Sequence, residues 1–302
     1  MPKSSMKTIK RRIKSVSSTL QITKAMEMVA SSKLRRAKQR AEALRPYLEA
    51  HEEMLADIAS SRTDFATVYT TARKIKNRLF IVIEGDRGLA GGYNSNVTRL
   101  VHSYIGKEAA EENPPKIIAI GRKSVEYFKK IGWEVLTEHP YFSENVKPGR
   151  VGDITDMVTE MFKAGEVDEV MLFYTNYISA LKQEPAKIKL LPFDLSGKIS
   201  LDLEQFGEES KYVQYKHETI NYDPSPEAVF DRIIPKMLMS MLSCACIDSF
   251  ASEQSARRNA MESASDNAAD MIDKLSLQYN RARQEKITNE INEIVGGANA
   301  IS

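Results

Sequence analysis

The first sixty residues carry an apolar stripe with a seven-residue period, and this stripe limits the possible folds more than any other feature. Along it only Thr23, Glu27 and His51 are not apolar. A stripe held at 3.5 residues per turn is typical of a supercoiled helix packed against another long helix. We therefore expect a coiled-coil helix over residues 1–60. Its stripe consists of Met6, Ile9, Ile13, Val16, Leu20, Thr23, Glu27, Ala30, Leu34, Ala37, Ala41, Leu44, Leu48, His51, Leu55 and Ile58.

A second long helix is expected at the other end of the chain. Ser225 is a favourable N-cap, Pro226 suits the first helical position, and Glu227 places an acid in the first turn. Apart from Pro235, no helix breaker follows before Gly296. Two helices of this length exceed an ordinary domain, so we expect them to pair as an antiparallel coiled coil. The expected stripe of the second helix is Met261, Ala264, Ala268, Met271, Leu275, Ala282, Ile287, Ile291 and Ile294.

Between these helices, short apolar runs alternate with helical segments. Such alternation favours a mostly parallel sheet covered by helices. The fold class is therefore α/β, with a Rossmann-like α/β domain inserted between two coiled-coil helices. The expected domains are 1–60, 75–195 and 222–302, with a connecting segment over 195–222. Strands are expected at 79–83, 116–120, 133–136, 169–177 and 186–193, and helices at 95–111, 124–130 and 153–163.

Charge is distributed very unevenly along the chain. Residues 1–45 hold thirteen Lys or Arg and two acids, a net charge of +11, whereas the whole chain carries only +2. Such a basic helix could contact nucleic-acid phosphates. However, residues 1–45 contain no aromatic side chain for stacking on bases. A solvated face, or one that meets acidic protein loops, fits better, and a basic scaffold or nucleic-acid-binding protein is the alternative.

Neither membrane insertion nor thiol chemistry is expected. No run of about 18 apolar residues is evident, and the first residues show neither an apolar leader core nor a cleavage signal. We therefore expect neither a membrane span nor a leader segment. Cys244 and Cys246 lie two residues apart in the second long helix, where their side chains diverge. They are expected to be reduced, semi-buried packing residues.

The sequence contains no recognisable catalytic, cofactor or metal site. The loop at 85–94 follows a strand and precedes a helix, as phosphate-binding loops do. It matches neither the dinucleotide-binding pattern nor the P-loop, and it lacks the phosphate-binding Lys. Asp86 and Arg87 in this loop are therefore expected to face a protein partner. The four histidines, at 51, 102, 139 and 217, are scattered and suggest no triad or ligand set.

Long, specific motifs lie at both ends and in the middle of the chain. They are Ile9-Lys10-Arg11-Arg12-Ile13-Lys14-Ser15-Val16, Gln21-Ile22-Thr23-Lys24-Ala25-Met26-Glu27-Met28-Val29-Ala30, the loop at 85–96, Ala251-Ser252-Glu253-Gln254, Asp266-Asn267-Ala268, Tyr279-Asn280-Arg281-Ala282-Arg283-Gln284 and the run at 287–298. These segments resemble the gamma subunit of bacterial F-type ATP synthases, and the resemblance accounts for the whole chain.

The resemblance implies a non-catalytic rotor subunit, present once per complex. Its coiled coil would turn inside the ring of alpha and beta subunits, and its α/β domain would join the epsilon subunit and the membrane-embedded c ring. Rotation would couple ion flow to ATP synthesis or hydrolysis through differential contact with each conformation of the catalytic subunits. The protein would then be peripheral, on the cytoplasmic face of the bacterial membrane. The coupling ion, proton or sodium, is left open because that choice lies in the c ring.

The resemblance also implies which residues touch partner subunits, and packing within the chain is the alternative for each. The rotor–stator contacts would be Met26, Glu253, Arg257, Gln284 and Thr288, which meet the catch loops of the catalytic subunits. At the foot, Tyr222 and Asp223 would contact the c ring, although the family often has Glu where Asp223 stands. The apolar C-terminal residues Ile294, Val295 and Ile301 would turn within a hydrophobic collar.

Overall fold

The computed structural model describes residues 6–61, 67–193, 223 and 225–299. Two very long helices stand at the ends of the described chain, and five strands with shorter helices lie between them in sequence. This order confirms the expected fold class. The elements are α1 (Met6–Ser61), β1 (Arg78–Ile83), α2 (Tyr93–Ile105), α3 (Lys107–Glu112), β2 (Lys116–Ile120), α4 (Arg122–Lys130), β3 (Val135–His139), the 3₁₀ turn η1 (Ser143–Asn145), α5 (Pro148–Lys163), β4 (Glu169–Tyr177), β5 (Gln183–Leu191) and α6 (Pro226–Asn299).

The chain divides into two compact units. One comprises Met1–Ala30 and Arg257–Ser302, and the other comprises Ser31–Ala256. Both long helices contribute to both units, so the second unit combines the sheet with the adjoining helical segments. The domain boundaries expected from the sequence remain a prediction.

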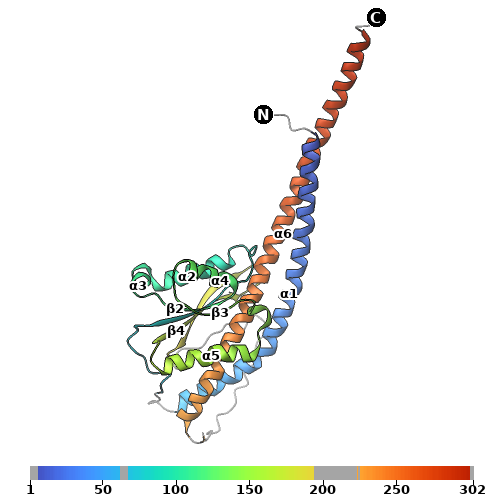
Figure 1. Ribbon diagram of the computed structural model, residues 1–302. Coiled ribbons are helices and arrows are strands. Elements are labelled where there is room, and N and C mark those ends of the chain that lie inside the picture. The colour runs from blue at the N-terminus through green and yellow to red at the C-terminus, as the bar shows by residue number, and fades with distance from the viewer. Residues whose placement is uncertain (1–5, 62–66, 194–222, 224, 300–302) are drawn as a thin grey trace. The chain divides into compact units, whose positions relative to one another are not determined.

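The second unit is built on a five-stranded sheet with the order β3-β2-β1-β4-β5 (Figure 1). The first four strands are parallel and β5 runs antiparallel to β4. Strand β1 lies between β2 and β4, and its residues Leu79 to Ile83 are buried, as expected for a central parallel strand. Strand β5 lies at an edge and exposes Lys187 and Lys189, which discourages pairing with another sheet.

Alternate side chains of the strands fill two separate cores. On one face, residues such as Ile81 and Leu172 pack with α5 and the sheet-side parts of α1 and α6. On the other face, Phe80 and Phe173 pack with α2, α3 and α4. The ring centroids of Phe80 and Phe173 lie 4.9 Å apart in an edge-to-face arrangement, which adds to the burial of both rings.

The expected strands 79–83, 116–120 and 169–177 are confirmed, whereas several boundaries were wrong. The helix expected over 95–111 is divided because Gly106, at φ +75°, ends α2 in a left-handed conformation. Strand β3 begins after Trp133, whose ring stacks on Phe128 with a centroid separation of 5.4 Å. Helix α5 begins earlier than expected, at Pro148, because proline is well suited to a first helical turn.

The stripe on α1 is confirmed at each position whose side chain is described. These residues, from Met6 to His51, are buried or half-buried, whereas the off-stripe Ile22, Met28 and Val29 are 57–69% exposed. The heptad pattern therefore identifies the packed face correctly. The side chains of Leu55 and Ile58 lie outside those described.

The stripe expected on α6 was partly wrong. Met271 is 50% exposed, and Ile272 is half-buried in its place. The actual heptad face is Met261, Ser265, Ala268, Ile272, Leu275, Tyr279 and Ala282. Beyond it, Ile287, Ile291 and Ile294 are exposed, and Figure 1 shows α6 continuing past the first described turn of α1.

Part of α6 is apolar enough to span a membrane by length and composition. It was not evident as a simple apolar run because Lys236, Asp248 and several serines interrupt it. In the structure 83% of this stretch is buried within the protein, so packing on the sheet accounts for its composition. Cys244 and Cys246 lie here as free, buried thiols, and burial raises the pKa of Cys246 well above its usual range. Both are inert packing residues, as expected.

Gly121 provides a test of this fold. It has φ +91°, and a Cβ atom would lie 1.9 Å from the carbonyl oxygen of Glu84. We expect Gly121→Ala to lower the free energy of unfolding by more than about 3 kcal/mol, because both conformational strain and a backbone clash result. The matched control is Gly132→Ala, at φ +81° with open space around the new Cβ, which should cost about 1 kcal/mol. Equal losses in urea unfolding would contradict the close approach.

Candidate functional site

Polar side chains of α6 bind the part of β4 that extends beyond β1. The pairing of β1 with β4 ends at Phe173. Beyond it, Ser249 Oγ accepts a hydrogen bond from the Thr175 N–H at 3.0 Å, and the Ser252 hydroxyl donates to the Thr175 carbonyl at 3.2 Å. Asp248 Oδ2 accepts from the Tyr177 N–H at 3.2 Å. Because buried backbone groups need partners, these polar residues fix the position of α6 on the sheet.

Glu253, one of the expected rotor–stator contacts, is packed inside this unit. It is 6% exposed, and a Cβ atom on Gly85 would lie 2.8 Å from its Oε1. The carboxylate therefore lies directly on the start of the loop at 85–94, the glycine-rich loop, where only glycine leaves enough space. Burial raises the pKa of Tyr93 well above its usual range, and the charge of Glu253 adds to this rise. The contact of Glu253 with a partner subunit remains a prediction.

The glycine-rich loop is held by Asp86, which the sequence analysis assigned to a partner-facing surface. Asp86 Oδ1 accepts hydrogen bonds from the N–H groups of Arg122, at 2.9 Å, and Tyr141, at 2.8 Å. The half-buried carboxylate thus joins the loops that follow β1, β2 and β3. Arg87 is exposed, and Leu89 is 65% exposed with φ +62°. Arg87 and Leu89 are therefore the side chains of this loop that a partner can reach.

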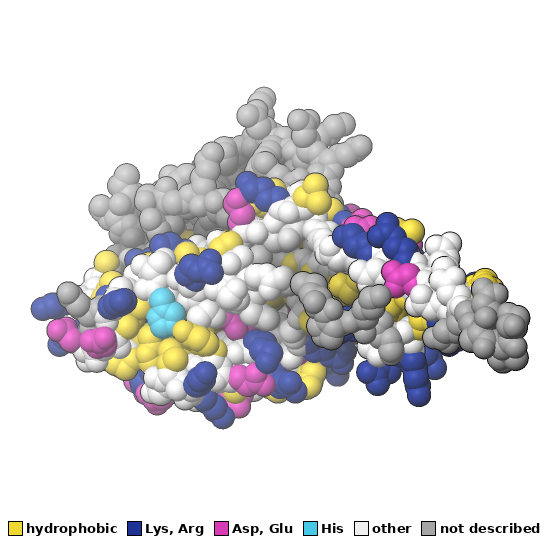
Figure 2. Space-filling view, turned by 90° about the horizontal axis from the view of Figure 1, so that it is seen from above, with side chains coloured by type: hydrophobic (Ala, Val, Ile, Leu, Met, Phe, Trp, Pro, Cys, Tyr) yellow, Lys and Arg dark blue, Asp and Glu magenta, His cyan; other side chains and the backbone are white. Residues whose placement is uncertain are grey.

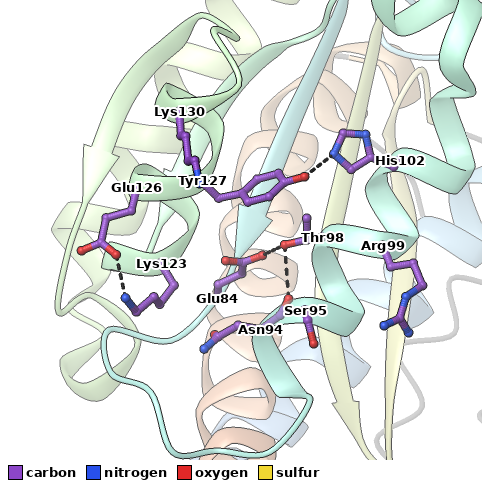
Figure 3. Close-up of a pocket in the computed structure, with 10 residues that line it drawn as sticks. All are labelled: Glu84, Asn94, Ser95, Thr98, Arg99, His102, Lys123, Glu126, Tyr127 and Lys130. Atoms are coloured by element: carbon purple, nitrogen blue, oxygen red, sulfur yellow. Dashed lines mark hydrogen bonds and ion pairs between the residues drawn. The ribbon is translucent and has the colours of Figure 1, made fainter.

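Next to this loop, a cleft of about 510 Å³ lies between α2 and α4. Figure 3 shows side chains of the two helices facing each other across it, with Glu84 between them. Glu84 directly follows β1 and is 2% exposed. The lining residues are Glu84, Asn94, Ser95, Thr98, Arg99, His102, Lys123, Glu126, Tyr127 and Lys130.

Burial dominates the electrostatics of Glu84. It raises the pKa of this carboxyl to about 7, although a hydrogen bond from Thr98 and the charge of Lys123 oppose the rise. The Thr98 hydroxyl donates to Glu84 Oε1 at 2.6 Å. Farther along the cleft, His102 Nε2 and the Tyr127 hydroxyl are 2.8 Å apart, and burial lowers the pKa of His102. The contact between His102 and Tyr127 joins α2 to α4, whereas the Thr98 hydrogen bond joins α2 to the residue after β1.

Sequence reasoning did not find this cleft, although a signal was present. Asn94, Thr98 and His102 recur at four-residue spacing and therefore share one face of α2. On α4, Lys123, Tyr127 and Lys130 follow the same helical spacing. Because helices that follow neighbouring parallel strands stand side by side, these two faces could have been expected to meet.

In the first unit, a buried hydrogen bond explains the polar position in the heptad stripe. The hydroxyls of Thr23, on α1, and Ser265, on α6, are 2.7 Å apart and buried. Small side chains at this level let the hydroxyls meet, so Thr23 is a partner of α6. Among the expected rotor–stator residues of this unit, Met26 is half-buried, Arg257 is buried, and Gln284 and Thr288 are exposed.

The remaining expected positions are less informative. Asp223 is exposed, whereas Tyr222 and Ile301 lie outside the described residues. Lys and Arg side chains, with acidic ones among them, stand at the surface in Figure 2. Within the described part of the chain, no three His, Cys, Asp or Glu side chains gather into a metal-binding group.

The comparisons with known proteins agree with this architecture. A family model described as ATP synthase matches residues 5–301. A protein of Ruminococcus albus named ATP synthase gamma chain is 48% identical over 290 residues, 96% of each chain. A protein of Acetobacterium woodii named ATP synthase gamma chain, sodium ion specific, is 42% identical and matches 97% of this chain and 98% of its own length.

Solved structures show the same fold. A chain in the central stalk and c ring of the Tetrahymena thermophila mitochondrial ATP synthase is 25% identical, with a TM-score of 0.59 over 81% of this chain and 99% of its own. A chain of the Euglena gracilis mitochondrial ATP synthase, at 18% identity, has a TM-score of 0.65 over 98% of this chain and 94% of its own and shows the fold alone. Full-length matches of this kind define a subunit of ATP synthase. The chain belongs to the ATP synthase gamma-chain family.

Removing the Asp86 carboxylate tests its internal role. We expect Asp86→Ala to lower the free energy of unfolding by about 1–3 kcal/mol, because two backbone donors lose a charged acceptor. Hydrogen exchange should accelerate at the amides of Arg122 and Tyr141, the two groups that donate to this carboxylate. Arg87→Ala, in the same loop, is the control and should leave both amides protected. Unchanged exchange in the Asp86 variant would refute the assignment.

The raised pKa of Glu84 gives a pH dependence of stability. With the pKa at about 7 when folded and 4.5 ordinarily, the folded state binds the proton more tightly. The contribution of Glu84 to the free energy of unfolding is therefore fully present below about pH 4.5. It is lost as the pH rises through about 7, and the loss is about 3 kcal/mol in all. We expect Glu84→Gln, which is always neutral, to be more stable than the parent at pH 8, with a smaller difference near pH 5.

Urea unfolding of both proteins across this pH range measures the difference. Glu126→Gln is the control, because Lys123 lowers the pKa of the exposed Glu126. Its small effect should have the opposite sign, with the parent slightly more stable at high pH. A pH-independent difference between Glu84→Gln and the parent would show that Glu84 is not a buried, titrating carboxyl.

Proposed function

We propose that the chain is the central-stalk rotor subunit of an F-type ATP synthase. It couples ion flow through the c ring to ATP synthesis or hydrolysis in the ring of alpha and beta subunits. The observation that carries this proposal is similarity to gamma chains over nearly the whole length, at 48% identity and 96% coverage of both chains for the Ruminococcus albus protein. The alternative of a scaffold or nucleic-acid-binding protein receives no support from these relatives.

The helix pair of the first unit suits a rotating element. Its heptad packing and the buried Thr23–Ser265 hydrogen bond fix the register of α1 against α6. A fixed register lets the pair transmit torque without sliding. Different faces of such an asymmetric pair stabilise different conformations of the surrounding subunits, and this differential binding is what couples rotation to nucleotide affinity.

The exposed residues of the expected set are the direct contacts to the catalytic subunits in this proposal. Gln284 and Thr288 are one helical turn apart on α6, and both are exposed. Met26 is half-buried among the exposed Ile22 and Met28 of α1. The buried Glu253 and Arg257 contribute through smaller accessible surfaces.

The other partner surfaces follow the same reasoning. Arg87 and Leu89 present the glycine-rich loop to a neighbouring subunit, while Asp86 holds the loop. Tyr222 and Asp223 form the foot contact with the c ring, and the exposed Ile294 and Val295 meet an apolar collar. One copy per complex binds alpha, beta, epsilon and c-ring subunits. The chain has no active site of its own and works on the cytoplasmic face of the membrane as a peripheral protein.

Coexpression with the alpha, beta and epsilon subunits of the same organism tests the function. We expect a complex that contains one copy of this chain and, with the membrane sector, makes ATP in response to an ion gradient. Nucleotide chemistry should remain in the alpha and beta subunits, and the isolated chain should not hydrolyse ATP. Failure to assemble, together with salt-sensitive nucleic-acid binding by the chain alone, would overturn the proposal.

Variants of α6 test the direct contacts. We expect Gln284→Ala with Thr288→Ala to lower gradient-driven ATP synthesis about thirtyfold, because two polar contacts of about 1 kcal/mol each are lost at the interface. Gln278→Ala is the matched control, an exposed glutamine on another face of the same helix. Assembly and thermal stability should stay unchanged in both. Equal effects of the two replacements would exclude a specific contact.

A further inference from the structure

The cleft between α2 and α4 has no part in the rotor function described above, yet its side chains are arranged as in a binding site. We propose that it binds a small polyhydroxylated anion of the sugar phosphate class. In this arrangement the hydroxyls of the ligand meet the floor of the cleft and its anionic group meets the basic rim. This inference is independent of the proposed rotor function.

The position and size of the cleft fit a small molecule. Glu84 follows β1, and Lys123 lies in the first turn of α4, which follows β2. One end of the cleft therefore lies at the carboxyl ends of β1 and β2, the edge at which open α/β sheets bind ligands. Its volume of about 510 Å³ is within the range of ligand pockets. The same edge carries the N-termini of α2 and α4, whose partial positive charges favour an anion.

The floor of the cleft offers hydrogen-bond acceptors and donors. Glu84 Oε1 accepts one hydrogen bond from Thr98, and a carboxylate has room for several more. The Tyr127 hydroxyl and the side chain of Asn94 line the same space (Figure 3). Burial of a carboxyl group is costly, and its retention at the base of an open cleft is explained by a ligand that donates hydrogen bonds to it. Hydroxyl groups do so without bringing a charge.

The rim determines the charge of the ligand. Arg99, Lys123 and Lys130 line the cleft against a single acid, Glu126, which forms ion pairs with Arg122 at 3.1 Å and with Lys123 at 2.6 Å. The positive charge of Lys123 already acts on Glu84, because it lowers the pKa of this carboxyl against the effect of burial. A cationic ligand would therefore meet a net positive rim, whereas a phosphate would be attracted to it. Among the described residues no set of acids, histidines and cysteines could hold a metal ion instead.

Binding to the full-length chain tests the proposal by saturation-transfer NMR and thermal shift. The probes are glycerol 3-phosphate, ribose 5-phosphate and glucose 6-phosphate, with ribose and inorganic phosphate as partial ligands. We expect at least one sugar or polyol phosphate to bind with a dissociation constant below about 10 mM and about tenfold tighter than either partial ligand, because both ends of the molecule are recognised.

Matched variants locate the site. At pH 8, Glu84→Gln should weaken binding about tenfold, since a charged acceptor becomes neutral, while the chain remains folded. Lys130→Ala should also weaken binding severalfold. Lys129→Ala is its control, because the neighbouring Lys129 pairs with Glu138 at 2.5 Å and does not line the cleft.

Three results would overturn the proposal. The first is the absence of saturable binding for every phosphate probe. The second is equal affinity for inorganic phosphate and the sugar phosphates, which would leave only a basic surface. The third is equal weakening by Lys129→Ala and Lys130→Ala, which would place the ligand elsewhere.

Discussion

The hydrogen bonds between α6 and β4 are the constraint on which the second unit depends. Strand β4 is longer than β1, so its last residues have backbone groups that no strand can pair. Asp248, Ser249 and Ser252 supply the missing partners from a helix that is otherwise apolar there. A slip of α6 along the sheet would break all three contacts at once. Each buried amide left unpaired would then cost about 1–3 kcal/mol. The long helix is thereby fixed on the sheet by direction-specific hydrogen bonds as well as by apolar packing.

The same helix shows how far sequence patterns could predict this structure. The seven-residue period and the capping residues identified both long helices. At the start of α6, the Ser225 hydroxyl accepts a hydrogen bond from the Ala228 N–H at 3.2 Å, as its capping role predicts. The face of α1 could be predicted because one seven-residue pattern runs along it. The face of α6 could not, because Met271 and Ile272 are both apolar and only the partner helix decides between them. Ser265 was missed for a related reason: a buried serine is recognisable only once Thr23 is known to oppose it.

The functional residues show a similar limit. Resemblance to a family indicates which residues take part in contacts between subunits. It does not distinguish side chains that face a partner subunit from side chains that stabilise their own chain. Asp86 stands in a loop motif, yet its carboxylate binds two backbone amides of neighbouring loops. Glu253 likewise packs on Gly85, within its own unit. Gln284 and Thr288 are exposed, and this difference in burial is the reason why we propose them as the direct contacts.

The glycine-rich loop joins these arguments, because three buried requirements meet around it. Gly121 allows the backbone at Glu84 to approach, Gly85 leaves space for Glu253, and Asp86 ties the loop to the two loops beside it. None of these requirements involves the outer surface of the loop. The exposed side chains of Arg87 and Leu89 are therefore held on a rigid support, which lowers the entropy lost when a partner binds.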